Sequence, residues 1–335
     1  MNIFRHRWRV IREHPSKGES LISSVVGVLV LLAIWHVLTM GPPEKRIMNA
    51  IALPSIKETV QSFPSLWFER ELSRGALVSL GRVLGGFFLA SIIALPLGVL
   101  SGAYPMINAF LRPVSILGRN VPIAALVGLA MFWFGIGETQ KIMFVFMATA
   151  AFILFDSTHA VEGVSDRFLD TAYTLGAKKD TRGGAIKAAV IGVIYALLVA
   201  FALSLLSTSD QGLGDRLASG KFWITAGVGW VIGFLLWFPI LGHQVISKVM
   251  LPLALPNITN SLRLLFGLAF GYIMLVEMVH AQAGLGHIIN MSQKRGPREH
   301  VYLCIIIIAL LAFVIDRVAL WLQHRLFPYV HHVEN

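Results

Sequence analysis

The amino-acid sequence predicts an all-α polytopic membrane protein, and three observations lead to this fold class. Hydrophobic residues make up 56% of the chain and charged residues only 14%, whereas soluble domains are roughly 45–50% apolar and about 25% charged. The apolar residues gather in runs, most of them near the length of about 20 residues that a helix needs to cross a bilayer. No segment alternates apolar and polar residues over about 10 residues, as the strands of a membrane β-barrel do.

The apolar runs give the number and order of the expected helices. They cover residues 21–40, 77–101, 121–136, 140–156, 185–207, 222–242, 264–282 and 301–320. We therefore expect about eight transmembrane helices. The third and fourth runs are the shortest and are separated only by residues 135–138.

The segments around the first run predict how the chain crosses the membrane. Residues 1–20 are basic, and the run at 21–40 is longer than the apolar part of a usual signal peptide, so we expect it to remain as the first transmembrane helix. Residues 41–75 hold four prolines and charges of both signs, which predicts a periplasmic loop with a short interfacial helix. Lys and Arg are more frequent on the side of residues 1–20, so both chain ends are expected in the cytoplasm.

The composition and the motifs also exclude several function classes. The formal net charge is +10, but the basic residues lie in short segments between apolar runs, which is typical of membrane proteins and not of nucleic-acid-binding ones. The sequence contains no phosphate-binding loop and no zinc-protease or serine-hydrolase motif. The single cysteine, Cys304, cannot form an internal disulfide or a cysteine-based metal site. We therefore expect no catalytic residue, no cofactor and no metal.

The polar segment 156–181, predicted on the cytoplasmic side, has the spacing of a short amphipathic helix. Phe168, Ala172 and Leu175 fall on one face of such a helix, and Gly176 stands at a suitable helix end. Two interpretations fit this pattern equally. The helix docks into a groove of a partner protein, or it rests on lipid headgroups.

Prolines and glycines predict local features of the remaining runs. Pro252 and Pro256 indicate that no helix continues before residue 257 and that the chain turns sharply there. The pairs Gly229–Gly233 and Gly267–Gly271 have the spacing that permits close helix packing.

Three charged residues lie inside predicted membrane helices, where an unpaired charge is costly. Arg82 and Asp316 are near the ends of their runs and are expected to reach water at the headgroups. Glu277 lies deeper and is expected to face the interior of the bundle. There it either lines a transport pathway or pairs with Arg82, so Arg82 and Glu277 are the candidate pathway residues.

Several motifs in a shared order resemble those of ABC importer permeases, the binding-protein-dependent inner-membrane components. Residues Asp170–Gly176, continued by the Leu-Pro pairs at 251–252 and 255–256, resemble the EAA loop of that family. Four further segments resemble its core, at Ser79–Gly102, Leu111–Ile142, Leu275–Asn290 and Ile315–Tyr329. The last two are similar to the branch that imports nitrate, sulfonates, taurine or bicarbonate.

The resemblance implies a function and a set of partners. The chain is then the translocation subunit of an importer for a small oxyanion in the bacterial inner membrane, working with cytoplasmic ATPase subunits, an extracytoplasmic solute-binding protein and a second permease copy. The ATPase-coupling residues that it implies are Asp170, Thr171, Ala172, Leu175, Gly176, Ala177, Lys178, Leu251 and Pro252. The alternative from another class is a gradient-driven secondary transporter or channel, which is expected to show internal repeats that we do not find.

The chain departs from the family pattern inside the loop itself. Gly176 and Leu251 are much further apart in sequence than their counterparts in the family. We therefore expect a two-helix insert at 182–246, placed between a first core part at 76–181 and a second at 247–329, with a tail at 330–335. The core then has five or six helices. The insert is either a peripheral hairpin or a contact for a lipid, another subunit or a regulator.

Overall fold

The computed structural model describes residues 16–42, 44–49, 51–206 and 220–328. In that part of the chain the regular structure is helical apart from one isolated β-bridge, which confirms the all-α fold. Seven of the described helices are long and apolar enough to cross a membrane, and a bent pair of helices brings the number to eight. The expectation of about eight spans is therefore confirmed.

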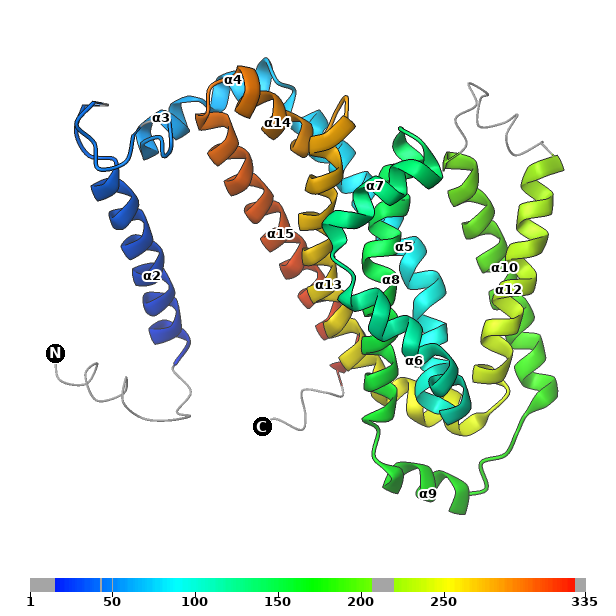
Figure 1. The fold of residues 1–335 in the computed structure, drawn as a ribbon. Coiled ribbons are helices and arrows are strands. Elements are labelled where there is room, and N and C mark those ends of the chain that lie inside the picture. The colour runs from blue at the N-terminus through cyan, green and yellow to red at the C-terminus, as the bar shows by residue number, and fades with distance from the viewer. Residues whose placement is uncertain (1–15, 43, 50, 207–219, 329–335) are drawn as a thin grey trace.

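Three long helices form the centre of the bundle (Figure 1): α5 (Leu72–Ala103), α8 (Glu138–Glu162) and α13 (Leu251–His280). Glycines allow α5 to approach α8 closely, because a Cβ atom at Gly86 would lie 2.5 Å from the carbonyl oxygen of Ile142. Val83, Val145 and Phe270, one from each helix, meet in a fully buried cluster. Helix α15 (Glu299–Leu326) lies beside α13.

The prediction of one span at 121–136 is wrong in its bounds. The apolar run forms only the twelve-residue helix α7 (Ile123–Phe134), and the crossing is completed by α6 (Pro105–Asn120), which meets α7 at a bend of 104°. The bend falls at Val121 because the following Pro122 disfavours the helical conformation there. The fourth run is part of the longer helix α8.

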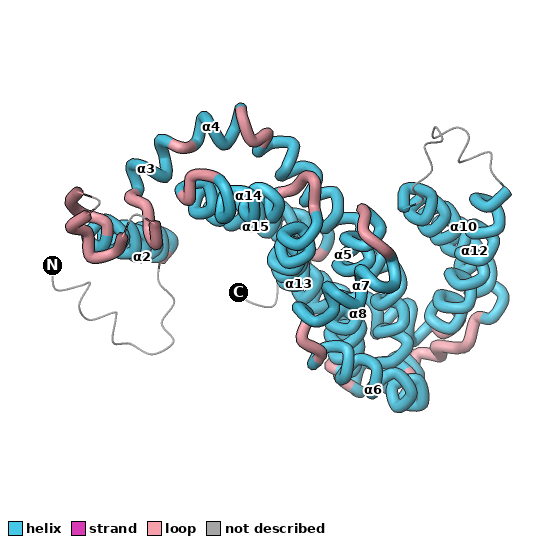
Figure 2. The backbone as a smooth tube through the Cα atoms, turned by 45° about the horizontal axis from the view of Figure 1, so that its top comes forward, coloured by secondary structure: helices cyan, strands magenta, loops and turns pink. Residues whose placement is uncertain are grey.

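The segment that precedes the bundle contains more structure than one interfacial helix. Helix α2 (Lys17–Leu38) is followed by two short helices, α3 (Ile56–Gln61) and α4 (Phe63–Phe68). Arg46 holds Glu58 of α3 through two hydrogen bonds of 2.8 and 3.0 Å. Helix α2 itself stands apart from the bundle (Figure 2). The loop that follows it is tied back to α2, because the indole N–H of Trp35 donates to the carbonyl of Pro54.

Two antiparallel helices, α10 (Thr181–Leu206) and α12 (Gly220–Leu241), form a hairpin at the side of α5. Gly229 and Gly233 lie against α10, as their spacing predicts. At Gly267 and Gly271 no described atom of the chain lies within 4 Å of a Cβ atom built at either position, so the close packing that their spacing permits is not made within this chain.

The expected break at Pro252 and Pro256 is also wrong. A π-helical turn, η1 (Ile246–Met250), leads directly into α13, which begins at Leu251. Pro252 occupies the first turn, where a backbone N–H would have no partner in the helix, and Pro256 is accommodated within α13. The chain turns earlier, at Gly242, where α12 ends.

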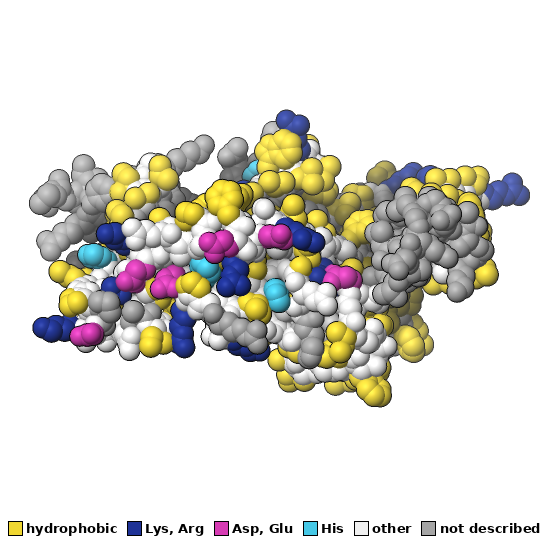
Figure 3. Space-filling model, turned by 90° about the horizontal axis from the view of Figure 1, so that it is seen from above, with side chains coloured by type: hydrophobic (Ala, Val, Ile, Leu, Met, Phe, Trp, Pro, Cys, Tyr) yellow, Lys and Arg dark blue, Asp and Glu magenta, His cyan; other side chains and the backbone are white. Residues whose placement is uncertain are grey.

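The two ends of the bundle carry different elements. Helix α9 (Asp166–Thr174), the first turn of α2 and the last turn of α15 lie at one end (Figure 1). The short helices α3 and α4 and helix α14 (Leu285–Arg295) lie at the other end. Viewed from that second end, charged side chains of both signs gather across the middle of the surface (Figure 3).

Candidate functional site

Helix α9 ends in a defined stop at Gly176. Gly176 has a φ of +84°, in the left-handed region that favours glycine. Its N–H donates to the carbonyl of Tyr173, and the N–H of Ala177 donates to the carbonyl of Ala172, each at 3.0 Å. This pair of bonds is the Schellman motif, which satisfies the last carbonyls of a helix. The helix end expected at Gly176 is therefore present.

The predicted coupling residues do not share one environment. Ala172 is buried against Ile246 and Met250, whereas Phe168 is exposed and Leu175 is 83% exposed. The remaining predicted residues of this segment fall into two groups. Four of them are exposed, namely Asp170, Thr171, Gly176 and Lys178, whereas Ala177 is partly buried. The helix thus has a small buried face and a larger free surface that includes two large apolar side chains.

A short backbone pairing closes the loop at the base of the hairpin. The N–H of Asp180 donates to the carbonyl of Gly242 at 2.8 Å, and the N–H of Lys178 donates to Oε1 of Gln244 at 3.3 Å. Residues 178–180 therefore lie beside 242–244, although the hairpin separates them in sequence. This neck (residues 178–180 and 242–244) brings the two parts of the predicted coupling loop together.

The second part of the predicted loop packs against the first. Leu251 and Ala177 are both partly buried against the apolar cluster that contains Ala172. Pro252 follows in the first turn of α13. Val245 and Ile246 also belong to this cluster, and they follow the hairpin, whose second helix ends at Leu241.

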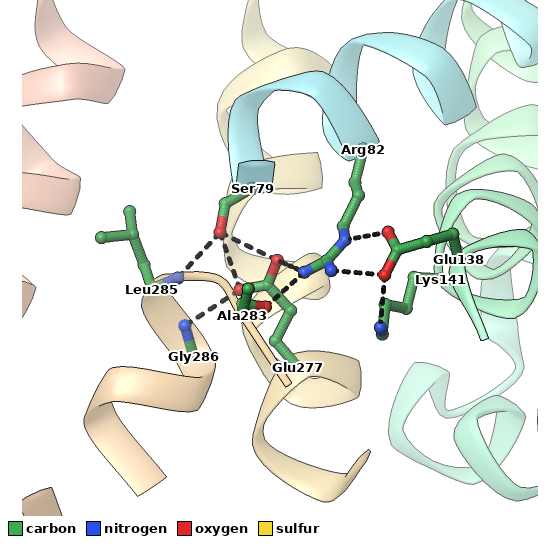
Figure 4. Close-up of polar contacts among 8 residues, drawn as sticks. All are labelled: Ser79, Arg82, Glu138, Lys141, Glu277, Ala283, Leu285 and Gly286. Carbon is green, nitrogen blue, oxygen red and sulfur yellow. Dashed lines mark hydrogen bonds and ion pairs between the residues drawn. The ribbon is translucent and has the colours of Figure 1, made fainter. Parts of the chain in front are cut away.

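A network of charges lies near the opposite end of the bundle (Figure 4). Arg82 of α5, only 4% exposed, donates from Nη1 to Oε1 of Glu277 at 2.7 Å. Its Nε and Nη2 atoms donate to the two carboxylate oxygens of Glu138, each at 2.6 Å. Lys141 completes the network by donating to Oε1 of Glu138 at 2.8 Å. Two cations and two anions thus balance one another, with Arg82, Lys141 and Glu277 buried and Glu138 57% exposed at the edge of the network.

The Glu277 carboxylate also holds the start of α14. It accepts from the Ser79 hydroxyl at 2.7 and 2.8 Å and from the N–H of Gly286 at 2.9 Å. The N–H of Leu285 donates to the Ser79 oxygen at 2.9 Å. These groups satisfy the first backbone donors of α14, which have no partner within the helix.

Gly284 leaves room for this arrangement. Its φ of +122° lies outside the range of other residues, and a Cβ atom there would lie 2.5 Å from the Glu277 carboxylate. Arg82 also donates to the carbonyl of Ala283, so the turn from α13 to α14 is held from two sides.

The network corrects one expectation and extends another. The expectation that Arg82 reaches headgroup water is wrong, because its guanidinium is enclosed by carboxylates of two other helices. The alternative pairing of Glu277 with Arg82 is observed. Glu138 and Lys141 were missed, since each lies far from Arg82 in sequence and no spacing rule connects them. Asp316 is half-exposed and pairs with Arg263 at 3.2 Å.

The comparison with protein families matches the last third of the chain. The family described as binding-protein-dependent transport system inner membrane component matches residues 242–328. The match begins at Gly242, directly after the hairpin, and it confirms the recognition of an ABC-type permease.

Full-length relatives extend the similarity to nearly the whole permease. A putative ABC transporter permease protein of Methanocaldococcus jannaschii is 25% identical over 301 residues, covering 88% of this chain and 87% of the relative. The taurine transport system permease protein of Escherichia coli is 23% identical, with 97% and 94% covered. The bicarbonate transport system permease protein of Synechococcus elongatus is 22% identical, with 93% and 92% covered.

A solved structure shares the fold of this permease. The MetNI methionine ABC transporter, in an inward-facing conformation, matches with a TM-score of 0.53 and 17% identity over 78% of this chain and 97% of the other. Fold, family match and relatives agree on a multi-span transport permease. They support this interpretation and not the gradient-driven alternative.

Proposed function

We propose that the chain is the translocation subunit of an ATP-driven importer for a small oxyanion, such as a sulfonate, taurine, bicarbonate or nitrate. The named functions of the taurine and bicarbonate relatives support this substrate class. The chain resides in the bacterial inner membrane, with both ends in the cytoplasm. A second copy of the permease completes the pathway.

The observation that carries the proposal is the construction of α9. The helix is fixed to the core by Ala172 and the neck, yet it presents Phe168 and Leu175 to solvent. An exposed apolar surface on a rigidly held helix suits docking into a groove of a partner protein. We assign this groove to a cytoplasmic ATPase, whose closure moves α9 and, through Ala172, the start of α13. The coupling loop consists of the predicted coupling residues between Asp170 and Lys178, together with Leu251 and Pro252.

The opposite end suits a solute-binding protein. A hollow of about 220 Å³ opens there between α4, α5 and α14, and its lining includes Arg70, Arg74 and His287. Charges of both signs line it and gather around it (Figure 3). A partner with complementary charges would bind this surface in one orientation. Arg82 and Glu277 lie beneath this surface and hold α14 at the outer end of the pathway.

The proposal is tested by purifying the tagged chain from gently solubilised native membranes. We expect a cytoplasmic ATPase to co-purify in a roughly equal amount, and the reconstituted complex to take up a sulfonate only when ATP is supplied. Uptake that follows a proton or sodium gradient, with no ATPase bound, would instead establish the gradient-driven alternative.

Gly176 offers a specific test of coupling. Gly176→Asp places a branched, charged residue at a φ of +84° beside the docking surface, so we expect about a tenfold loss of ATPase co-purification. The bundle should keep most of its thermal stability, because the strain falls in an exposed loop outside the membrane-spanning helices and no described atom lies within 4 Å of the new Cβ. The control is Gly176→Asn, since Asn tolerates this conformation and should retain most of the binding. Normal ATPase recovery with Gly176→Asp would remove α9 from the coupling role.

A further inference from the structure

Helix α6 is turned with its polar face inward. One face of α6 carries four apolar side chains that are exposed to between 58 and 84%: Met106, Phe110, Val114 and Leu117. Three other apolar residues of the helix, Ile107, Leu111 and Ile116, lie on the inward side. Its opposite face points toward α8 and carries polar and basic side chains: Asn108, Arg112, Ser115 and Arg119. This is the reverse of a helix on a soluble protein. In a membrane protein it is the arrangement expected where a helix separates lipid from a hydrated cavity.

A cavity of about 470 Å³ lies between this polar face and the last two turns of α8. From α8 it is lined by Phe155, Thr158, His159 and Glu162. Because α8 runs on into α9, the cavity opens at the end of the bundle that carries the proposed coupling helix. Its volume is within the usual range for a small-molecule site.

The acidic groups near this cavity are already engaged. The Glu162 carboxylate accepts from the Asn108 amide and lies 3.1 Å from Nδ1 of His159. Asp156, on the same helix, lies close enough to Ser261 and Arg119 to interact with both. The Arg119 guanidinium stacks 3.7 Å above the Phe155 ring, which fixes its plane.

Arg112 is the basic residue of the cavity that is not engaged with an acidic group. Among the residues that the structure describes, its guanidinium has no ion-pair partner, although it lines the same cavity as Arg119. A guanidinium presents a planar fork of N–H donors that matches two oxygens of one oxyanion. Arg112 is exposed at the cavity, and a positive charge beside low-dielectric walls attracts an anion more strongly than it would in open water.

We propose that the α6–α8 cavity binds one oxyanion group through Arg112, with Arg119 beside it. The group is a sulfonate, carboxylate or phosphate, and it belongs either to the transported solute or to a lipid headgroup. If the oxyanion belongs to the transported solute, the proposal rests on the proposed function, and the cavity is then a solute-binding site at the cytoplasmic end of the transport pathway. Neither source requires Glu162 to change partners.

The test uses the purified full-length chain in nanodiscs of phosphatidylcholine, with ethanesulfonate as the soluble probe and calorimetric titration as the measurement. In a second set of nanodiscs, phosphatidylglycerol is added and retained lipid is counted by native mass spectrometry. The variant is Arg112→Gln. The control is Lys57→Gln, which removes one exposed positive charge from α3, at the other end of the bundle.

We expect saturable binding of at least one probe, weakened about tenfold or more by Arg112→Gln and unchanged by Lys57→Gln. Loss of ethanesulfonate binding identifies the solute as the source of the oxyanion, and loss of phosphatidylglycerol alone identifies the lipid headgroup. Absence of saturable binding of both probes, or equal binding by Arg112→Gln, overturns the proposal. ATPase co-purification, scored on the same variants, reports separately on the proposed function.

Discussion

The centre of the bundle and the α10–α12 hairpin are both helical and apolar, yet they are held in different ways. In the centre, Arg82, Lys141 and Glu277 are all under 5% exposed and are joined into one network across α5, α8 and α13. The hairpin contains no comparable network among its described residues. Its two helices meet through glycines and a cluster of small residues around Phe222.

The attachment of the hairpin to the rest of the chain is correspondingly narrow. It includes the neck and the packing of Ile240, Leu236 and Trp237 against the cluster around Ala172. Two hydroxyl groups also bond across it, from Tyr195 to the carbonyl of Ile92 at 2.6 Å and from Tyr104 to the carbonyl of Pro239 at 3.4 Å. The difference indicates that the centre depends on specific partners, whereas the hairpin depends on close packing and can be changed without disturbing the centre. The predictions below test each half of this statement.

The largest effect is expected from Arg82→Met. The substitution leaves the Glu277 carboxylate buried without its cation, and breaking a buried ion pair in this way costs about 3–5 kcal/mol. The thermal unfolding midpoint in detergent should fall strongly. In the double variant with Glu277→Leu, both charges are gone, so part of the loss should be recovered. An equally large loss in the double variant would mean that the pairing is not the source of the stability.

Gly284→Ala should have the next largest effect. The new methyl group meets the Glu277 carboxylate, and the backbone conformation of Gly284 is strained for any other residue, so we expect a loss of about 1–3 kcal/mol. The matched control is Gly267→Ala in α13, where the methyl group meets open space and the stability should be kept or slightly raised. Equal unfolding midpoints for the two variants would contradict the proposed role of the turn.

Much of the fold could be predicted from the sequence, because a bilayer imposes a length and an apolar composition on each span. The errors occur where backbone geometry decides. Pro122 separates α6 from α7, whereas Pro252 lies in the first turn of α13 and Pro256 lies within that helix. The outcome depends on the position of each proline in the folded chain. Composition alone does not fix that position.

The site could be predicted only in part, for a related reason. The stop at Gly176 is local and is visible in sequence. The network around Arg82 joins residues from three helices and a turn, so it depends on packing that no spacing rule describes. The neck is similar, since residues 178–180 and 242–244 come together only through the hairpin between them. The coupling and pathway roles of these residues stay predictions.

Excision of the hairpin tests the other half of the comparison. Deleting 181–241 joins Asp180 to Gly242, which are already hydrogen-bonded at 2.8 Å. The shortened chain should insert in the membrane, and its unfolding midpoint should fall less than that of Arg82→Met. The control is a deletion that extends to Ile246, because it also removes Val245 and Ile246 from the cluster around Ala172 and should be clearly worse. Failure of the shorter deletion to insert would make the hairpin part of the core.

The smallest effect is expected at the ion pair of Arg46 and Glu58, which lies outside the bundle and is exposed on its carboxylate side. The Arg46 guanidinium, together with the N–H of Ser55, lowers the pKa of Glu58 to about 2 from its ordinary value of 4.5. Because the pKa is lower in the folded state, the stabilisation by this pair is fully present above about pH 4.5. It is lost as the pH falls through about 2.

The measurement is a carboxyl NMR titration of Glu58 in the wild-type chain and in Arg46→Ala. The variant should titrate closer to the ordinary value, and the difference in unfolding midpoint between the two chains should shrink below pH 4.5. The difference should also shrink in high salt, because Glu58 is one-third exposed and its interaction with Arg46 is screened. A salt-independent difference would show instead that the pair is sheltered like Arg82 and Glu277, and the contrast between exposed and buried charges in this protein would no longer hold.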